Sequence, residues 1–196
     1  MDIEPVSLDG RYVRLEPLRE GHAAGLFEIG RDASIWTWML RVPFTTVDEA
    51  RELIAGAEAL ERAGTQLPWA IIEKATGRVA GSTRYLNNSH VDRGHEIGHT
   101  WLGVAFQRTV VNTECKYLLL RHAFESLGCA RVQFKTDALN ERSRRAIERI
   151  GATFEGVLRK YQLTRGDRIR DTAMYSITDE EWPGVKTMLE EKLNLS

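Results

Sequence analysis

The sequence passes directly from an apolar strand into a helix at residues 107–113, and this junction limits the folds that the chain can adopt. Residues 96–104 read as a strand. Residues 113–127 carry a wide apolar stripe at helical spacing, which predicts a well-buried helix that stops at Gly128. A helix start presents unpaired backbone N–H groups and the positive end of the helix dipole. The junction is therefore suited to bind phosphate.

Capping boxes, glycine stops and alternating runs divide the chain into elements in the order β-α-α-β-β-β-α-β-α-β-β-α. Thr46 and Glu49 form a capping box, and Asn140 can cap a helix that ends at Gly151. Three successive runs predict an antiparallel meander: residues 67–73, 79–86 and 96–104. We find no internal repeat or linker. We expect one domain over residues 1–196, of mixed α/β class, with a mostly antiparallel sheet of about seven strands flanked by helices.

Composition and charge argue against several classes of function. With 27 Lys and Arg against 28 Asp and Glu, the net charge is −1, so no global field attracts nucleic acid or an anionic membrane. The arginines in residues 142–149 are interspersed with acids, which predicts a solvated helix face. Cys115 and Cys129 lack C-x-x-C spacing, and no apolar run approaches a membrane span. We expect a cytoplasmic protein with no metal and no nucleic-acid or membrane partner.

Two motifs together point to a known family. The Gln107-x-x-x-x-Asn112 turn, followed by Asn140-x-x-Ser143 before a Gly-Ala pair, resembles the GNAT acetyltransferases, and more narrowly their RimJ/RimL-type branch. Further phrases typical of that branch lie at residues 11–18, 155–159 and 168–177. The resemblance covers nearly the whole chain. It implies acetyl-CoA as donor and direct attack by a primary amine, which would belong to a peptide or protein N-terminus or to a small aminoacyl-type molecule. It also allows a homodimer.

The resemblance also implies where the cofactor binds. The CoA pyrophosphate would lie on the N–H groups of residues 110–113, and the pantetheine arm would run between two splayed strands near residues 101–104 and 132–135. Asn140 and Ser143 would face the thioester end. The implied cofactor-binding residues are Trp101, Leu102, Val104, Gln107, Arg108, Thr109, Val110, Val111, Asn112, Thr113, Asn140 and Ser143.

The turn departs from the family pattern at Val110 and Asn112, which stand where glycines are usual. Asparagine tolerates the left-handed conformation. A valine at position 110 would be strained by ~1–3 kcal/mol if φ there is positive, and would cost little if the position already belongs to the helix. Weak CoA binding, or loss of activity with the fold retained, stays open.

Acetyl transfer requires that the ammonium lose a proton, that the oxyanion find a donor, and that the leaving thiolate gain a proton. Glu96 is the candidate base, because many GNAT enzymes place a glutamate on this strand that works through water. The alternative is a surface carboxylate paired with Arg84 or a similar cation. His99, three residues along, is a weaker candidate. Side chains alternate on a regular strand, so Glu96 and His99 can line one site only if a bulge intervenes.

Ser143 is the second catalytic candidate, since the resemblance places it near the thioester sulfur; a first-turn serine bonded to backbone is the alternative. The acid used in the ribosomal-protein branch is matched here by Gln162, which cannot act as a base. In the family an irregular aromatic segment borders the acceptor cleft, and core packing is the alternative for its tryptophans. The expected substrate-binding residues are Trp36, Trp38, Tyr85 and His99.

Two other functions compete with catalysis. A non-catalytic acyl-CoA-binding or sensor domain would explain Val110 and the absent acid at Gln162. A protein-interaction module, paired through strand edges, would explain neither of the two motifs. The leading interpretation is an acetyl-CoA-dependent N-acetyltransferase.

Overall fold

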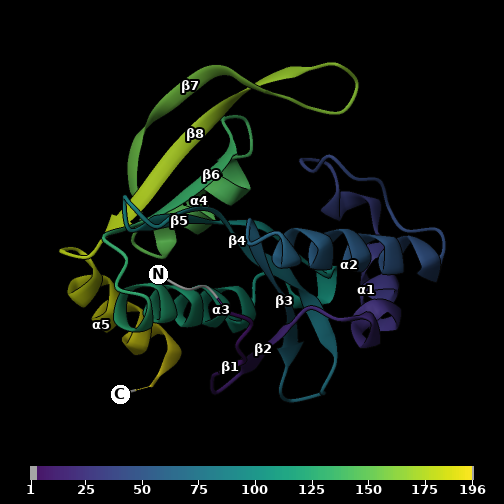
Figure 1. Cartoon of the computed structure of the whole chain (residues 1–196), viewed down its shortest axis with the longest axis horizontal. Helices are drawn as coiled ribbons and strands as arrows, with labels where there is room; N and C mark the ends of the chain where they lie inside the picture. Colours follow the sequence, from purple (N-terminus) through teal and green to yellow (C-terminus); the bar gives the residue numbers. More distant parts are fainter. Residues whose placement is uncertain (1–3, 196) are drawn as a thin grey trace.

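One mixed sheet organises the described part of the chain, residues 4–195 of the computed structural model (Figure 1). Its eight strands have the order β1-β2-β3-β4-β5-β6-β8-β7, and every neighbouring pair is antiparallel except β5 with β6. The strands are β1 (Leu8–Asp9), β2 (Val13–Pro17), β3 (Gln66–Glu73), β4 (Val79–Ser89), β5 (Gly94–Leu102), β6 (Arg131–Asp137), β7 (Thr153–Leu163) and β8 (Ile169–Thr178). The predicted fold class is confirmed. The count is eight rather than about seven because β1 adds a two-residue edge strand to β2.

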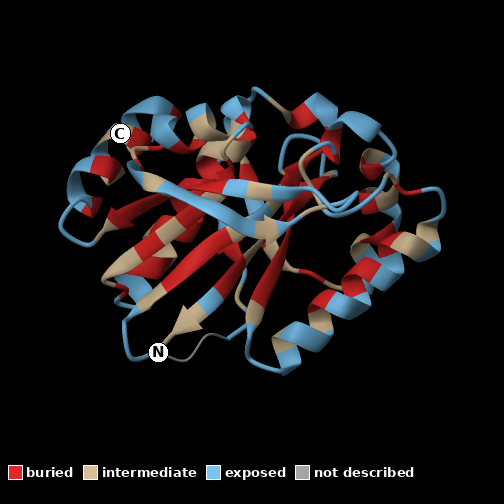
Figure 2. Cartoon of the chain, turned by 90° about the horizontal axis from the view of Figure 1, so that it is seen from above, coloured by how far each residue is buried: buried red, intermediate tan, exposed pale blue. Residues whose placement is uncertain are grey.

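Five α-helices of the described residues cover the sheet and build two cores. They are α1 (Ala23–Gly30), α2 (Val47–Arg62), α3 (Val110–Arg121), α4 (Glu141–Arg149) and α5 (Trp182–Leu193). One core joins α1 and α2 to β3 through Leu26, Ile54 and Ala70; the other joins α3 and α5 through Leu118 and Leu189. Figure 2 shows the buried residues on the strands and on the inward sides of the helices. No helix within residues 4–195 is long and apolar enough to cross a membrane.

Local capping accounts for several helix starts, as the sequence predicted. At α2 the Thr46 hydroxyl accepts from the Glu49 N–H at 3.4 Å, and the Glu49 carboxylate accepts from the Thr46 N–H at 3.3 Å. At α4 the Asn140 side chain accepts from the Ser143 N–H at 3.1 Å. These reciprocal bonds satisfy amide groups that a helix start otherwise leaves unpaired.

Two irregularities of β5 create the space for a site. Ser82 on β4 pairs with Trp101, and Arg84 pairs with Gly98, so β5 has one more residue than β4 between these pairs. That extra residue makes a β-bulge at His99, whose φ is 48°. The second irregularity lies on the other edge, where β5 pairs with β6 only from Gly94 to Glu96. Beyond Glu96 the two strands part.

Helix α3 begins at Val110, three residues earlier than the sequence predicted. Its N-cap is Thr109, whose hydroxyl accepts from the Val111 N–H at 3.2 Å. The residue with positive φ at this junction is Arg108, at 61°, and Val110 belongs to the first turn of the helix. The strain considered for Val110 is therefore absent, because the position needs no left-handed conformation.

Candidate functional site

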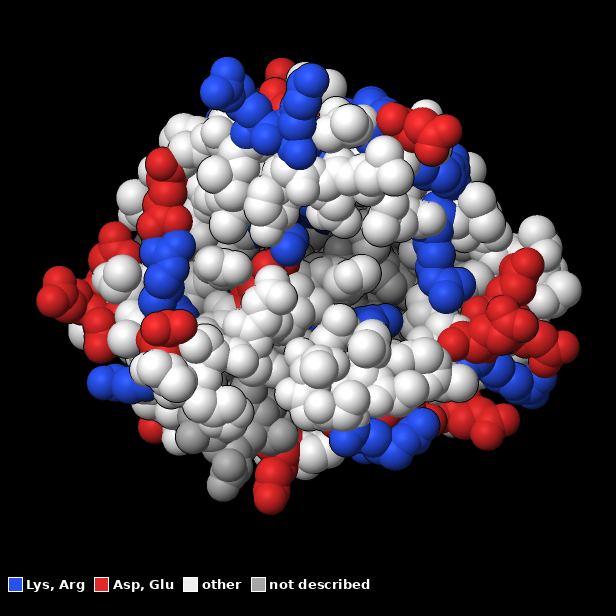
Figure 3. All heavy atoms as spheres, turned by 45° about the horizontal axis from the view of Figure 1, so that its top comes forward, with Lys and Arg blue, Asp and Glu red and all other residues white. Residues whose placement is uncertain are grey.

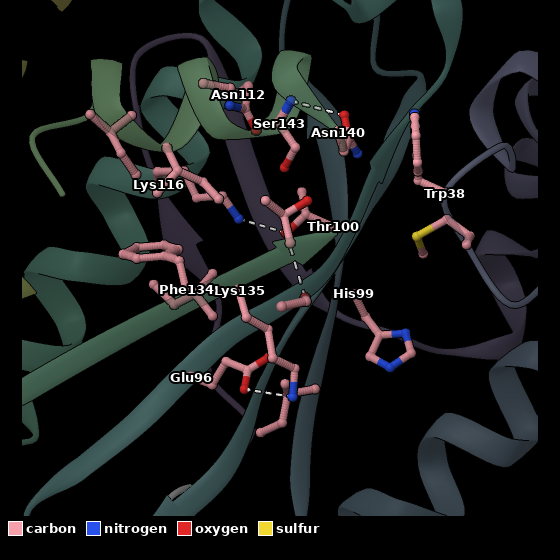
Figure 4. Close-up of a pocket in the computed structure, with 18 of the residues that line it drawn as sticks. Trp38, Glu96, His99, Thr100, Asn112, Lys116, Phe134, Lys135, Asn140 and Ser143 are labelled. Atoms are coloured by element: carbon pink, nitrogen blue, oxygen red, sulfur yellow. Dashed lines mark hydrogen bonds and ion pairs between the residues drawn. The ribbon is translucent and has the colours of Figure 1, made fainter. Parts of the chain in front are cut away.

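Two adjoining cavities open where β5 and β6 part, between α3 and α4. The first, called here the Glu96 cavity, has a volume of about 290 Å³ and reaches Glu96, His99 and Arg170 (Figure 4). The second, the arginine cavity, has a volume of about 490 Å³ and extends past the start of α3. The two share part of their walls: Trp38, Met39, Thr100, Asn112, Asn140, Ser143 and Ala146. They adjoin through this shared wall, which includes Asn140 and Ser143, and we treat them as one cleft.

The arginine cavity concentrates positive charge beside the N-terminus of α3. Arg108 from the turn and three arginines of α4 line it: Arg142, Arg145 and Arg149. Two hydrogen bonds hold the Gln107 side chain in place: its Nε2 donates to the Leu102 carbonyl at 3.0 Å, and its Oε1 accepts from Arg142 at 3.0 Å. Guanidinium groups and the start of a helix both favour phosphate. The three α4 arginines are exposed, as predicted for a solvated helix face, and the structure adds that this face borders the cavity.

The predicted cofactor residues divide into two groups in the structure. Those that line the arginine cavity are Trp101, Leu102, Gln107, Arg108, Asn112, Asn140 and Ser143. Thr109 instead caps α3, and Val111 lies in the core with 1% of its surface exposed. Val104 lies in a short 3₁₀ turn outside the cleft, while Val110 and Thr113 belong to α3 without lining either cavity. The side chains of these five residues are not part of the cleft wall.

Glu96 is buried in the wall of its cavity as a paired carboxylate. Its Oε2 accepts from Asn87 at 2.8 Å and from Gln133 at 3.3 Å, and lies 3.1 Å from Nζ of Lys135. The alternative considered for Glu96 was a surface carboxylate paired with Arg84 or a similar cation; Lys135 is that cation, but the carboxylate is buried. All three contacts go to Oε2. The other oxygen, Oε1, lies against Gly98, where an added Cβ would stand only 2.8 Å away.

His99 lines the same cavity as Glu96, which the bulge makes possible. Although the His99 side chain keeps an exposed surface, desolvation on its cavity side lowers its pKa to about 4, and four cations add to the effect: Arg84, Lys135, Arg170 and Arg41. The lowered pKa favours the neutral imidazole, which is a weak base. Desolvation is the larger cause, and the positive charge around the ring is the second.

Lys116 is a buried amine in the cleft that the sequence did not single out. It reaches from α3 toward β5, where its Nζ donates to the Thr100 hydroxyl at 2.5 Å (Figure 4). The Thr100 hydroxyl also contacts that of Thr83 at 2.8 Å. Burial lowers the pKa of Lys116 to about 8. The only available signal was a lysine within the apolar stripe of a helix.

Ser143 lies in the first turn of α4, and its side chain points into the cleft toward Thr100 (Figure 4). Trp38 and Gln162 also line the Glu96 cavity. The tip of the β7–β8 hairpin contacts the segment before α2, where Arg165 donates to the Arg41 carbonyl at 3.1 Å. The hairpin therefore covers one side of the cleft.

Trp36 and Tyr85 do not contact the cleft, so the expectation that they bind substrate is wrong. Trp36 is 2% exposed and donates to the Gly30 carbonyl at 2.7 Å. Tyr85 is fully buried on the α3 side of the sheet, and its hydroxyl donates to the Leu119 carbonyl at 2.5 Å. Both aromatic rings are packed in the hydrophobic cores, and the polar group of each donates to a backbone carbonyl. Within residues 4–195, no three His, Cys, Asp or Glu side chains are grouped so that they could hold a metal ion.

Comparison with known proteins gives consistent matches. The family model described as an acetyltransferase (GNAT) domain matches residues 13–153. An uncharacterised N-acetyltransferase of Bacillus licheniformis, p20, is 27% identical over 78% of this chain and 85% of its own length. A Bacillus subtilis (strain 168) protein, YdaF, named as a candidate ribosomal N-acetyltransferase, is 34% identical over 56% of this chain and 59% of its own.

Solved structures agree in fold. A GCN5-related N-acetyltransferase from Brucella melitensis has a TM-score of 0.92 and 33% identity, covering 97% of this chain and 86% of that one. The RimJ protein of Mycobacterium smegmatis in complex with CoA-disulfide has a TM-score of 0.83 and 24% identity, covering 96% of this chain and 95% of that one. At that identity the second likeness concerns the fold alone.

Proposed function

Because this chain belongs to the GNAT acetyltransferase family, in the RimJ/RimL-type branch that its motifs indicate, and is an acyltransferase, we propose that it moves an acetyl group from acetyl-CoA to a primary amine. The observation that carries the proposal is the joining of two unlike cavities at Asn140 and Ser143. One is rich in arginine and the other holds a buried carboxylate. A nucleotide and an amine call for these two environments.

The arginine cavity fits the phosphates of CoA. Arg108, Arg142 and Arg149 would hold them together with the N–H groups at the start of α3. The parting of β5 and β6 leaves backbone N–H and C=O groups beyond Glu96 without a partner strand. Such groups suit the amides of a pantetheine arm, which would then lead to Ser143.

In the proposed reaction the amine nitrogen attacks the thioester carbonyl, the new C–N bond forms, and the C–S bond breaks to release CoA as a thiol. Glu96 would accept the proton of the ammonium at Oε1, directly or through water, while Lys135 holds Oε2. The nitrogen would lose its second proton as the C–S bond breaks, and one proton would reach the leaving sulfur from the Ser143 hydroxyl, which regains it from the nitrogen. Direct attack needs no acyl-enzyme intermediate.

The test is release of thiol from acetyl-CoA in the presence of a panel of primary amines. We expect turnover, and we expect Glu96→Gln to lower kcat by tenfold or more. Glu52→Gln, an exposed carboxylate on α2, is the matched control. Tight binding of acetyl-CoA in calorimetry with no turnover on any amine would instead favour the sensor alternative.

The acceptor class is open between a peptide N-terminus and a small aminoacyl-type molecule. The name of YdaF supports the first of these, whereas Gln162 departs from the ribosomal-protein pattern. We further propose that residues 1–196 form a single domain and that the protein is cytoplasmic. We also propose that it uses no metal and binds neither nucleic acid nor a membrane. The net charge of −1 supports the absence of a nucleic-acid partner.

A homodimer, if formed, would use the edge strand β7. This strand lies at the end of the sheet, and the β7–β8 hairpin exposes a row of apolar side chains. They are Phe154, Val157, Leu158, Tyr161, Leu163 and Ile169. Exposed apolar edge strands favour pairing with another chain. Sedimentation of the wild type and of Leu158→Glu tests this, because a charge there would favour the monomer.

A further inference from the structure

The Glu96 cavity holds more positive than negative charge. Three cations line it, Lys116, Lys135 and Arg170, against the single carboxylate of Glu96. That carboxylate is already paired with Lys135 at 3.1 Å. No ion pair recorded within residues 4–195 joins Lys116 or Arg170 to a carboxylate. Figure 3 shows the hollow, with Lys and Arg atoms in its wall.

Arg170 is the cation best placed to bind a ligand. It belongs to β8 and lines the cavity, and its Nε donates a hydrogen bond to the Thr172 hydroxyl at 3.1 Å. Burial lowers the pKa of Arg170, and the charges of Asp137 and Glu96 oppose that shift by favouring the charged form. Asp137 is itself paired with Arg168, and Glu96 with Lys135, so neither neutralises Arg170.

Further positive charge surrounds His99 at the same end of the cavity. Arg84 and Arg41 both lower the pKa of that imidazole. Arg84 donates from Nη1 to Gln66 at 2.9 Å, but its Nε is buried and has no hydrogen-bond partner among the described residues. Arg84 does not line the cavity, so it would act on an entering anion through its charge and not by direct contact.

The phosphates of CoA do not account for this charge. They have four arginines of their own in the arginine cavity, and Arg170 lines only the Glu96 cavity. An acceptor amine enters as an ammonium, which adds one more positive charge to a region already rich in cations. A second, negative group on the acceptor would offset this repulsion.

We propose that the acetyl acceptor is a small amine that also carries a carboxylate, and that Arg170 binds this carboxylate while Glu96 receives the ammonium proton. The inference rests on the proposed function and narrows its acceptor. A cavity of about 290 Å³ suits a molecule of amino-acid size. A peptide N-terminus followed by an acidic residue offers the same chemistry, and the test separates the two.

The experiment compares kcat/KM for matched amines: an amino acid, its carboxamide, and a dipeptide amide with aspartate second. We expect the amino acid to exceed its carboxamide by at least tenfold. Arg170→Gln should reduce that ratio to about one, whereas Arg62→Gln, an exposed arginine on α2, should keep it. A ratio of one in the wild type, or a ratio unchanged by Arg170→Gln, would overturn the proposal. Preference for the dipeptide would overturn the small-molecule part of it.

A second readout does not depend on turnover. Binding of a carboxylate beside Arg170 should raise the pKa of His99 above about 4. NMR titration of the imidazole in the presence of the amino acid measures this pKa. The carboxamide brings an ammonium without a carboxylate, so it should not raise that pKa, and the rise caused by the amino acid should vanish in Arg170→Gln. No turnover on any amine, together with this shift, would reject the proposed reaction but keep the anion site. No shift at saturating amino acid would reject the anion site.

Discussion

Glu96 and His99 lie three residues apart on β5, yet both line the same cavity, because the bulge at His99 breaks the alternation of the strand. Without the extra residue the two side chains would face opposite sides of the sheet. Gly98, two residues after Glu96 in the regularly paired part of β5, lies against the Glu96 carboxylate on the same face. The irregularity of the backbone therefore decides the position of His99, while that of the proposed base follows from regular pairing.

Substitution of Gly98 by alanine should disable the site without unfolding the protein. The new Cβ would stand 2.8 Å from Oε1 of Glu96 and 2.9 Å from Leu86, closer than such atoms approach, so the carboxylate must move. We expect kcat/KM to fall by about tenfold or more. Gly56→Ala is the matched control, since a Cβ there meets nothing within 4 Å and should raise the free energy of unfolding by about 0.5–1 kcal/mol. Equal activity of the two variants would contradict the role given to Gly98.

Lys116 should destabilise the folded protein near neutral pH. Its pKa is about 8 when folded and 10.5 when exposed, so the unfolded chain binds more protons and stability rises with pH between these values. Lys116→Met should therefore raise the free energy of unfolding at pH 7 by up to about 3 kcal/mol. The advantage should shrink toward pH 10.5. Urea unfolding at both pH values measures it, and a difference that does not change with pH would show that the ammonium is not desolvated.

Glu114 should contribute strongly to the stability of the fold, because it anchors the start of β2. Its buried carboxylate accepts from the N–H groups of Arg11, Tyr12 and Val13 at 2.8, 2.7 and 2.6 Å. In Glu114→Gln one acceptor oxygen becomes a donor that faces other donors, so we expect a loss of about 2–4 kcal/mol in the free energy of unfolding. Glu52→Gln should change it by less than about 0.5 kcal/mol. Similar values for the two variants would mean that the bonds of Glu114 are replaced by water.

The arginines of α4 should set the affinity for CoA. Arg142→Gln and Arg149→Gln each remove a charged donor from the arginine cavity, and we expect the Kd to rise about tenfold for each. The wild type should also lose affinity more steeply than the variants as salt is raised. Calorimetry with CoA measures both effects. If Arg62→Gln weakened binding equally, the effect would be one of net charge and not of this cavity.

Val110 should not limit CoA binding, because it adopts the conformation of the helix. Val110→Gly should leave the Kd for CoA within about twofold and lower the free energy of unfolding by about 0.5–1 kcal/mol. Arg108 is the residue with positive φ, so Arg108→Gly should relieve about 1 kcal/mol of strain while weakening CoA binding through loss of charge. Tighter CoA binding by Val110→Gly would contradict this interpretation.

The sequence by itself determined the order of the elements, the helix caps at Thr46 and Asn140, the direct passage from β5 into α3 and the family. These features are local, because caps and periodicities depend on residues within one or two turns. From the sequence, a bulge was only a requirement for Glu96 and His99 to line one site. The bulge itself could not be predicted, because an extra residue in one strand is defined by its pairing with the neighbouring strand.

Only the tertiary structure decided which polar groups share the cleft. Lys116 and the α4 arginines looked like parts of ordinary helices, and Tyr85 and Trp36 looked like candidates for the acceptor site. Their places depend on how α3, α4 and β8 approach the gap between β5 and β6, which joins residues far apart in the chain. Helical spacing specifies one face of a helix but not what that face meets. For that reason the charge of the Glu96 cavity, and the carboxylate it calls for, emerged only from the folded chain.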